Sequence, residues 1–147
     1  MYKHLLVPLD RSDLAEQALP HAAELAQAMK ARITLVLVVQ VLDTETVAAA
    51  GAAYNWQAEV ADDHQYLQGL CARLHDSGVP CAAEVLNGDI GDAIVSYADE
   101  HDCDLIVMST HGRSGLGRWI YGSIADRVLT HTQVPLLLVR ATAIGEA

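Results

Sequence analysis

Short apolar runs alternate with amphipathic segments along the whole chain of 147 residues. The runs are rich in Leu, Ile and Val, and they occupy residues 5–9, 33–39, 81–86, 105–108 and 136–139. Apolar residues recur every three or four positions, as in α-helices, over residues 14–29, 56–75, 92–101 and 119–130. Runs that are apolar throughout are typical of strands covered on both faces. The alternation therefore predicts an α/β fold: a single Rossmann-like, doubly wound domain (residues 1–147), with a five-stranded parallel sheet and about four helices.

The chain is acidic, with 19 Asp and Glu residues against 9 Lys and Arg residues and a formal net charge of -10. A field of this sign repels phosphate backbones and anionic lipids, so we expect no nucleic-acid partner and no membrane partner. No apolar run approaches the ~20 residues that span a bilayer, and we expect neither a transmembrane helix nor a signal peptide. Cys71, Cys81 and Cys103 include no C-x-x-C pair and leave one thiol over. We therefore expect them to be small core residues of a cytoplasmic protein rather than a disulfide framework.

Residues 109–123, STHGRSGLGRWIYGS, follow an apolar run and open a helix. Glycines there let the backbone approach a ligand closely, and the N–H groups at the start of a helix attract anions. Three arginines stand against one aspartate between residues 109 and 127, which makes this stretch locally positive. The segment therefore favours a phosphate site, and the alternative is a flexible loop whose arginines balance nearby acids. The patterns G-x-x-x-x-G-K-[ST] and G-x-G-x-x-G are absent, which excludes P-loop and dinucleotide sites.

The same segment resembles a known family pattern. Ser109, two residues, Gly112, nine residues, then Gly122 and Ser123 are similar to the G-x-x-G-x9-G-[ST] pattern of the nucleotide-binding universal stress proteins. The segments VPLDRS, GDIGDAIVSYADEHDCDLIVMSTHGRSG, IADRVL and VPLLLVR extend the resemblance over essentially the whole chain. The resemblance implies the strand order 3-2-1-4-5, in which the first and fourth strands are neighbours where the order reverses and their loops share one crevice.

The resemblance also implies that ATP, or AMP or ADP, binds at the strand ends together with Mg2+. Val38 would line the adenine, while the glycine loop and the start of the last helix would hold the phosphates. The nucleotide-binding residues that the resemblance implies are Pro8, Leu9, Asp10, Val38, Met108, Ser109, Thr110, His111, Gly112, Arg113, Ser114, Gly115, Gly122, Ser123, Ile124 and Ala125. Adenine selectivity rests on the resemblance alone.

Three of these residues leave alternatives open. Asp10 would accept a hydrogen bond from a ribose hydroxyl or hold Mg2+ indirectly through water, but an aspartate before Ser12 is also an ordinary turn former. Ser109 replaces the first glycine of the pattern; a positive φ there would cost on the order of 1 kcal/mol, whereas with a negative φ its hydroxyl could add a phosphate contact. His111 would touch a phosphate or act as an acid, but no partner carboxylate is in view. We expect a positioning role for His111 and assign no catalytic residue.

The last apolar run is expected to lie at a sheet edge, and an uncovered edge invites pairing. We expect Leu136, Leu137, Leu138 and Val139 to pair with their own copy in a homodimer, as the resemblance also implies. Such a protein is expected to act as a nucleotide sensor or regulatory module in a stress response, read by a protein partner. A slow ATP hydrolase is the first alternative. A structural or chaperone-like dimer that binds no nucleotide is the second, and Ser109 is its best evidence.

Overall fold

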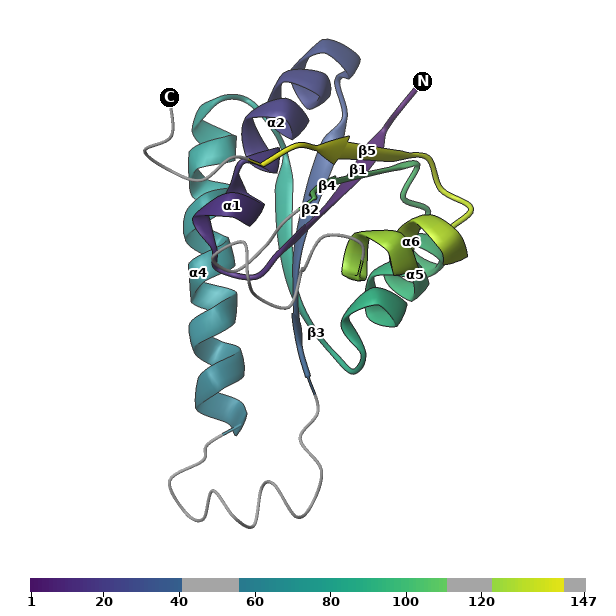
Figure 1. Cartoon of the computed structure of the whole chain (residues 1–147). Helices are drawn as coiled ribbons and strands as arrows, with labels where there is room; N and C mark the ends of the chain where they lie inside the picture. Colours follow the sequence, from purple (N-terminus) through teal and green to yellow (C-terminus); the bar gives the residue numbers. More distant parts are fainter. Residues whose placement is uncertain (41–55, 111–122, 142–147) are drawn as a thin grey trace.

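The computed structural model describes residues 1–40, 56–110 and 123–141, which build a three-layer α/β fold (Figure 1). The sheet is parallel throughout, with the strand order β3-β2-β1-β4-β5. Its strands are β1 (His4–Leu9), β2 (Arg32–Val39), β3 (Cys81–Asn87), β4 (Leu105–Ser109) and β5 (Leu136–Val139). The predicted fold class and strand order are confirmed.

Helices cover both faces of this sheet. They are α1 (Asp13–Glu16), α2 (Ala18–Met29), α4 (Trp56–Asp76), α5 (Ile90–Glu100) and α6 (Ile124–His131). Helices α1, α2 and α4 lie on one face, and α5 and α6 lie on the other (Figure 1). Within the described ranges, no helix is both long enough and apolar enough to cross a membrane.

The core is aliphatic and is centred on the middle strands. Every residue of β1 and of β4 is buried, as expected for strands that are covered on both faces. The chain contains no Phe, so Leu, Ile, Val and Ala fill the space between sheet and helices. The edge strand β3 differs, because its residues are half-buried or exposed. The central strands therefore pack against the helices on both faces and join the three layers.

The helix predicted over residues 14–29 is divided into α1 and α2, with Gln17 between them. Pro20 explains the break, because proline lacks an N–H and its ring clashes with the carbonyl of the residue four positions earlier, here Glu16. The register of α2 also differs at its end. The apolar spacing over residues 14–29 predicts that Met29 faces inward, but it is 37% exposed, and Ala26, one turn after Ala22, is buried instead.

The other helices agree with the sequence to within a few residues. Helix α4 ends where Gly78 adopts a φ of +84°, which only glycine reaches without strain. Helix α5 begins two residues before the predicted start, because the Asp89 carboxylate accepts a hydrogen bond from the N–H of Asp92 at 3.0 Å and caps the helix. The predicted helix over residues 119–130 is confirmed from Ile124 onward, and residues 119–122 lie outside the described ranges.

A buried histidine joins the amino ends of β1 and β2. His4 is 5% exposed, and burial lowers its pKa, so the ring is neutral in the folded protein. Its Nδ1 lies 3.1 Å from the His101 carbonyl, which can only accept, so Nδ1 carries the proton. Nε2 therefore accepts from the Thr34 hydroxyl at 2.7 Å. The polar groups at this end of the sheet are thus satisfied among themselves.

A disulfide between Cys71 and Cys81 contradicts the expectation of three unlinked cysteines. It joins the last turns of α4 to the start of β3, with the two Cα atoms 5.3 Å apart. The turn at Gly78 brings β3 back beside α4, so the partners lie ten positions apart in sequence. A search for C-x-x-C spacing cannot find such a pair. The predicted burial is closer to the structure, since Cys71 and Cys103 are buried and Cys81 is half-buried.

We predict that the disulfide is present in the isolated protein. Alkylation of the unfolded, unreduced chain should label one cysteine, and alkylation after reduction should label three, as counted by mass spectrometry. Reduction should lower the free energy of unfolding by about 2–3 kcal/mol, because the cross-link closes a short loop in the unfolded state. In the control variant Cys103→Ser, no cysteine should be labelled before reduction. Three labels on the unreduced wild type would show that the bond does not form.

Candidate functional site

The strand order reverses between β1 and β4, and most of the described candidate residues lie at this place. Leu5 and Leu6 of β1 pair with Leu105 and Ile106 of β4, so the two strands run side by side and end at the same edge of the sheet. The chain then continues from β1 to α1 on one face and from β4 toward α6 on the other (Figure 1). Open α/β sheets bind ligands at such a switch point, beyond the carboxyl ends of the strands.

The turn after β1 is organised by Asp10. One of its carboxylate oxygens, Oδ1, accepts hydrogen bonds from the Ser12 backbone N–H at 3.0 Å and from the Ser12 hydroxyl. Ser12 Oγ accepts in turn from the N–H of Ala15 at 3.0 Å and caps α1. Asp10 therefore forms the turn, as one of the sequence alternatives stated, and its proposed contact with ribose or Mg2+ would be additional.

Arg11, at the centre of this turn, has a left-handed backbone with φ 71°. This conformation costs a residue other than glycine on the order of 1 kcal/mol. The Arg11 side chain contacts α4. Its Nη2 lies 2.7 Å from Oδ1 of Asp63, and its guanidinium lies 5.4 Å from the ring centre of Tyr66. The side-chain interactions offset the strain of the backbone.

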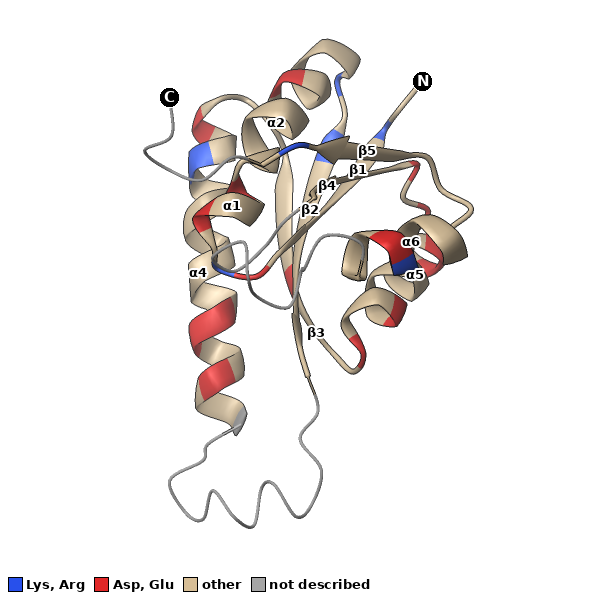
Figure 2. Ribbon diagram, in the orientation of Figure 1, with Lys and Arg blue, Asp and Glu red and all other residues tan. Residues whose placement is uncertain are grey.

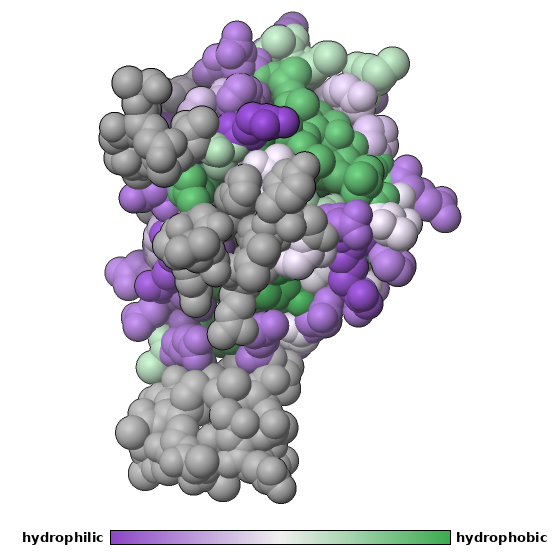
Figure 3. Space-filling model, viewed as in Figure 1, coloured by the Kyte–Doolittle hydropathy of each residue, from purple (hydrophilic) through white to green (hydrophobic). Residues whose placement is uncertain are grey.

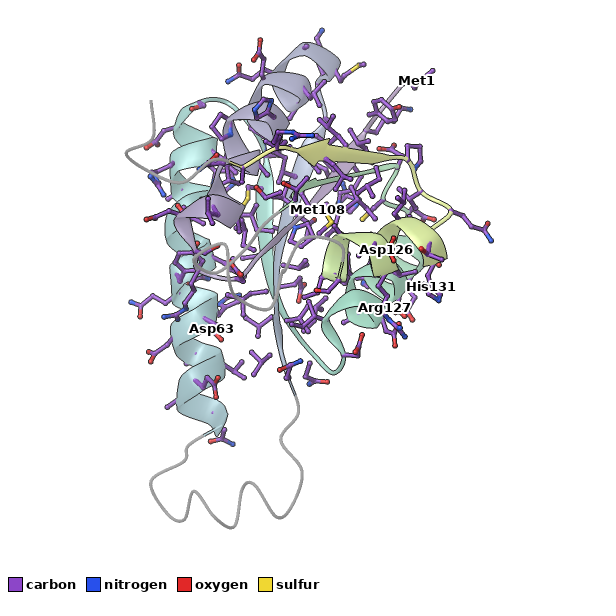
Figure 4. The ribbon with its side chains drawn as sticks, in the orientation of Figure 1. Met1, Asp63, Met108, Asp126, Arg127 and His131 are labelled. Atoms are coloured by element: carbon purple, nitrogen blue, oxygen red, sulfur yellow. A yellow bond between two sulfur atoms is a disulfide. The ribbon has the colours of Figure 1, made fainter. Side chains whose placement is uncertain are left out.

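Asp63 is not among the predicted site residues, although the sequence around it contains a signal. Val60, Leu67, Leu70 and Leu74 form the apolar stripe of α4, and position 63 falls on the same face at helical spacing. A carboxylate on such a stripe must be paired. Asp63 is 7% exposed, and burial raises its pKa while the Arg11 charge opposes that shift. Figure 4 labels Asp63 on α4.

Ser109, at the end of β4, needs no left-handed backbone. Among the described residues other than glycine, φ is positive at Arg11, Lys30 and Asp102. Ser109 therefore avoids the backbone strain that a positive φ would cause. The side chain is fully buried, and its hydroxyl donates to the Leu14 carbonyl of α1 at 2.6 Å. This hydroxyl, which was considered as a possible phosphate contact, thus fastens α1 to β4.

The neighbours of Ser109 present backbone rather than side chains to this edge. Pro8, Leu9 and Met108 (labelled in Figure 4) are buried in the sheet, so any ligand contact they make is through main-chain atoms. Val38, near the end of β2, is half-buried. The N–H of Thr110 donates to the Val139 carbonyl at 2.9 Å, which extends the pairing of β4 with β5.

Ser123 precedes α6, and its side chain makes no capping hydrogen bond. Ile124 and Ala125 are buried, with exposures of 9% and 8%. The first N–H groups of a helix have no partner within the helix, and together with the helix dipole they favour an anion at this end. The start of α6 therefore favours an anion, as the sequence predicts.

Arg127 does not contribute to the local positive charge as the sequence indicated. Its Nε and Nη2 donate to the two carboxylate oxygens of Asp92 at 2.8 and 3.0 Å, and Asp89 lies 3.5 Å away. This pairing raises the pKa of Arg127 and lowers that of Asp92. Arg127 is labelled on α6 in Figure 4. Gly91 makes room for it, because a Cβ there would lie only 2.8 Å from Cδ of Arg127. Arg127 thus joins α6 to α5.

The remaining candidates of the glycine loop fall outside the described residues. They are His111, Gly112, Arg113, Ser114, Gly115 and Gly122. Over the described ranges, no three His, Cys, Asp or Glu side chains gather closely enough to hold a metal ion.

A hollow of about 270 Å³ lies elsewhere, between α2 and α4. Alkyl groups of Leu19, Ala23, Leu70 and Leu74 line much of it. None of the residues predicted to bind nucleotide lies along it, so it is separate from the candidate site.

These features define a doubly wound α/β protein with a candidate anion site where the strand order reverses. The chain belongs to the universal stress protein family, whose family model matches residues 1–140. It is similar to universal stress protein MJ0531 of Methanocaldococcus jannaschii, with 31% identity over 144 residues that cover 95% of this chain and 83% of that protein.

Solved structures agree with this assignment. The universal stress protein UspA from Lactobacillus plantarum superposes with a TM-score of 0.81 at 26% identity, covering 95% of this chain and 98% of that one. A universal stress protein in complex with cAMP has a TM-score of 0.74 at 20% identity, over 96% of this chain and 99% of that one. The universal stress protein from Archaeoglobus fulgidus in complex with dAMP has a TM-score of 0.70 at 21% identity, over 95% and 98%. The last two likenesses show the shared fold.

We predict that Ser109 stabilises the fold through its hydroxyl. Ser109→Ala should lower the free energy of unfolding by about 1 kcal/mol, because the hydrogen bond from the buried hydroxyl is lost and the Leu14 carbonyl keeps the longer one from the Gln17 N–H, at 3.3 Å. Ser109→Gly, which restores the family's glycine, should lower it further, since glycine also weakens a strand. Urea unfolding measures both, with Ser96→Ala on the exposed side of α5 as the control. A Ser109→Gly variant as stable as wild type would contradict this role.

Proposed function

We propose that this universal stress protein binds an adenine nucleotide, ATP or its products ADP or AMP, at the carboxyl edge of β1 and β4. The observation that carries the proposal is the pairing of β1 with β4, which brings the Asp10 turn and the end of β4 to one switch point. Relatives of the same fold that hold cAMP and dAMP support an adenine nucleotide as the ligand class.

The proposed contacts divide the nucleotide among three elements. The half-buried Val38 lines the adenine, and Asp10 takes the ribose or, through water, the Mg2+ ion. The phosphates lie against the backbone N–H groups of the loop after β4 and of Ser123, Ile124 and Ala125. Bound Mg2+ would neutralise phosphate charge, which matters in a chain of net charge -10. We assign no group to activate water, so the function proposed is binding and regulation rather than hydrolysis.

The regulatory role rests on the same site. A ligand that binds one arrangement of the loop after β4 more tightly than another shifts the population between them, and a partner protein can read the shift. We propose that this readout belongs to a stress response in the cytoplasm. The Cys71–Cys81 disulfide counts against a reducing compartment, so a pair found mainly reduced in intact cells would support the cytoplasm and a pair found oxidised would contradict it.

The test of nucleotide binding is the thermal midpoint with and without millimolar Mg-ATP. At 100 times the dissociation constant, ATP should add about 2.7 kcal/mol of stability, which raises the midpoint by about 5–11 °C in a domain of this size. Gly112→Val should abolish the shift. Gly69→Val is the matched control, since a Cβ at position 69 of α4 meets nothing within 4 Å. An unchanged wild-type midpoint would refute the proposed function.

We also propose that the protein forms a homodimer through β5. This strand lies at the end of the sheet, Leu136 and Leu137 are half-buried, and Leu138 is 38% exposed. Figure 3 shows apolar surface over the region that β5 occupies in Figure 1. An apolar edge strand of this kind is covered when a second copy pairs with it.

The dimer proposal predicts the mass of the protein in solution. Analytical ultracentrifugation should give twice the chain mass for wild type and the chain mass for Leu138→Lys, because a buried lysine at the pairing edge costs several kcal/mol of desolvation. Met29→Lys on α2 is the control, with a starting exposure of 37% against 38% for Leu138. A monomeric wild type, or a dimer that survives Leu138→Lys, would exclude this interface.

A further inference from the structure

An ion pair between the partly exposed Arg11 and the buried Asp63 lies directly beside the proposed nucleotide site. Asp63 on α4 is 7% exposed, and its Oδ1 lies 2.7 Å from Nη2 of Arg11 in the turn after β1. Arg11 follows Asp10, so the pair is one residue away from the carboxylate proposed to contact ribose or Mg2+. A buried carboxylate is costly unless it is paired, so Asp63 holds Arg11 in place.

A second contact fastens the same segment to α4. The Tyr66 hydroxyl donates to Oε2 of Glu16 at 2.5 Å, and the Tyr66 ring lies against the Arg11 guanidinium. Asp63 and Tyr66 are neighbouring positions on one face of α4, three residues apart. Residues 11–16, from the turn to the end of α1, are therefore held at both ends by one helix.

The acidic residues around Arg11 favour its ion pair with Asp63 over an unpaired guanidinium. Acidic residues occur at several places along α4, as Figure 2 shows, and burial together with the charges of Glu59 and Asp62 raises the pKa of Asp63. The charge of Asp10 is likewise felt at Tyr66. Arg11 is thus the cation of a mostly acidic cluster, and its guanidinium is directed to α4.

Arg11 also occupies a position that strains any side chain. Glycine adopts a φ of 71° without steric cost, so arginine does not stabilise the backbone conformation at this position. What arginine adds is the contact with Asp63 and Tyr66. The residue is explained by its attachment to α4.

We propose that Arg11 and Asp63 are a positioning pair for the nucleotide site: they fix the turn after β1 so that Asp10 and its backbone face the ligand. The proposal deepens the proposed function and rests on it. Arg11 acts through the turn and does not touch the nucleotide. The alternative, in which Arg11 leaves Asp63 and binds a phosphate directly, is an outcome of the test.

The test combines a measurement without nucleotide and one with it. In Asp63→Asn, the amides of Ser12 and Ala15, which donate to Asp10 and Ser12, should exchange their hydrogens about tenfold faster, and the Kd for Mg-ATP should rise about tenfold. Arg11→Gln should do the same. Arg11→Lys, which keeps the charge, should restore the affinity to within about threefold of wild type. The control Asp62→Asn, one position away and exposed, should change neither quantity.

Each contrary result has a distinct meaning. Unchanged exchange of Ser12 in both Asp63→Asn and Arg11→Gln overturns the positioning role. Retained or tighter ATP binding in Asp63→Asn, together with loss in Arg11→Gln, overturns it in favour of a direct phosphate contact. A wild type that does not bind Mg-ATP overturns the proposed function instead, whatever the exchange rates. Because Arg11 is partly exposed, with 44% of its side chain accessible, the Arg11→Lys and Arg11→Gln comparison remains available if Asp63→Asn does not fold.

Discussion

Strands β1 and β4 are buried on both faces, and the rest of the structure depends on this constraint. Both strands are buried along their whole length, so helices must cover both faces of the sheet. β1 continues into helices on one face, and β4 continues toward α6 on the other. The two strands are parallel neighbours, so their carboxyl ends meet at one edge while the chain leaves that edge in two directions. Packing of the sheet and helices therefore creates, at the carboxyl ends of β1 and β4, a place where backbone groups are accessible to a ligand.

The fold could be predicted almost completely from the sequence, because strand burial and helix period are properties of neighbouring residues. The uncertain boundaries have local explanations that the pattern does not weigh: Pro20 divides α1 from α2, and the Asp89 cap starts α5 early. The described candidate residues also lie where the sequence placed them, at strand ends and at the start of α6. Their contact with a nucleotide remains a prediction.

Partners that are far apart in sequence could not be predicted. The Cys71–Cys81 bond depends on β3 returning beside α4, and the Arg11–Asp63 pair depends on α4 lying beside the turn after β1. The Ser109 hydroxyl meets the Leu14 carbonyl across 95 positions of sequence. In each case the residue type was visible, but its partner is set by how the layers pack. The Ser109 hydroxyl, one possible phosphate contact, and Arg127, counted in the local positive charge, are both engaged elsewhere for this reason.

These pairings change the physical account of how an acidic chain would hold an anion. Arg11 and Arg127 are each held by carboxylates, so neither supplies an uncompensated charge to the site. Among the described residues, the attraction for an anion therefore comes from the backbone N–H groups at the start of α6, and a cation that arrives with the nucleotide would add to it. Arg113 and Arg118 lie outside the described residues. Backbone dipoles act only over a short range and only in the correct geometry. Correct placement of the turn after β1 therefore matters, and the strained, partly exposed Arg11 is held next to Asp10 by the buried Asp63.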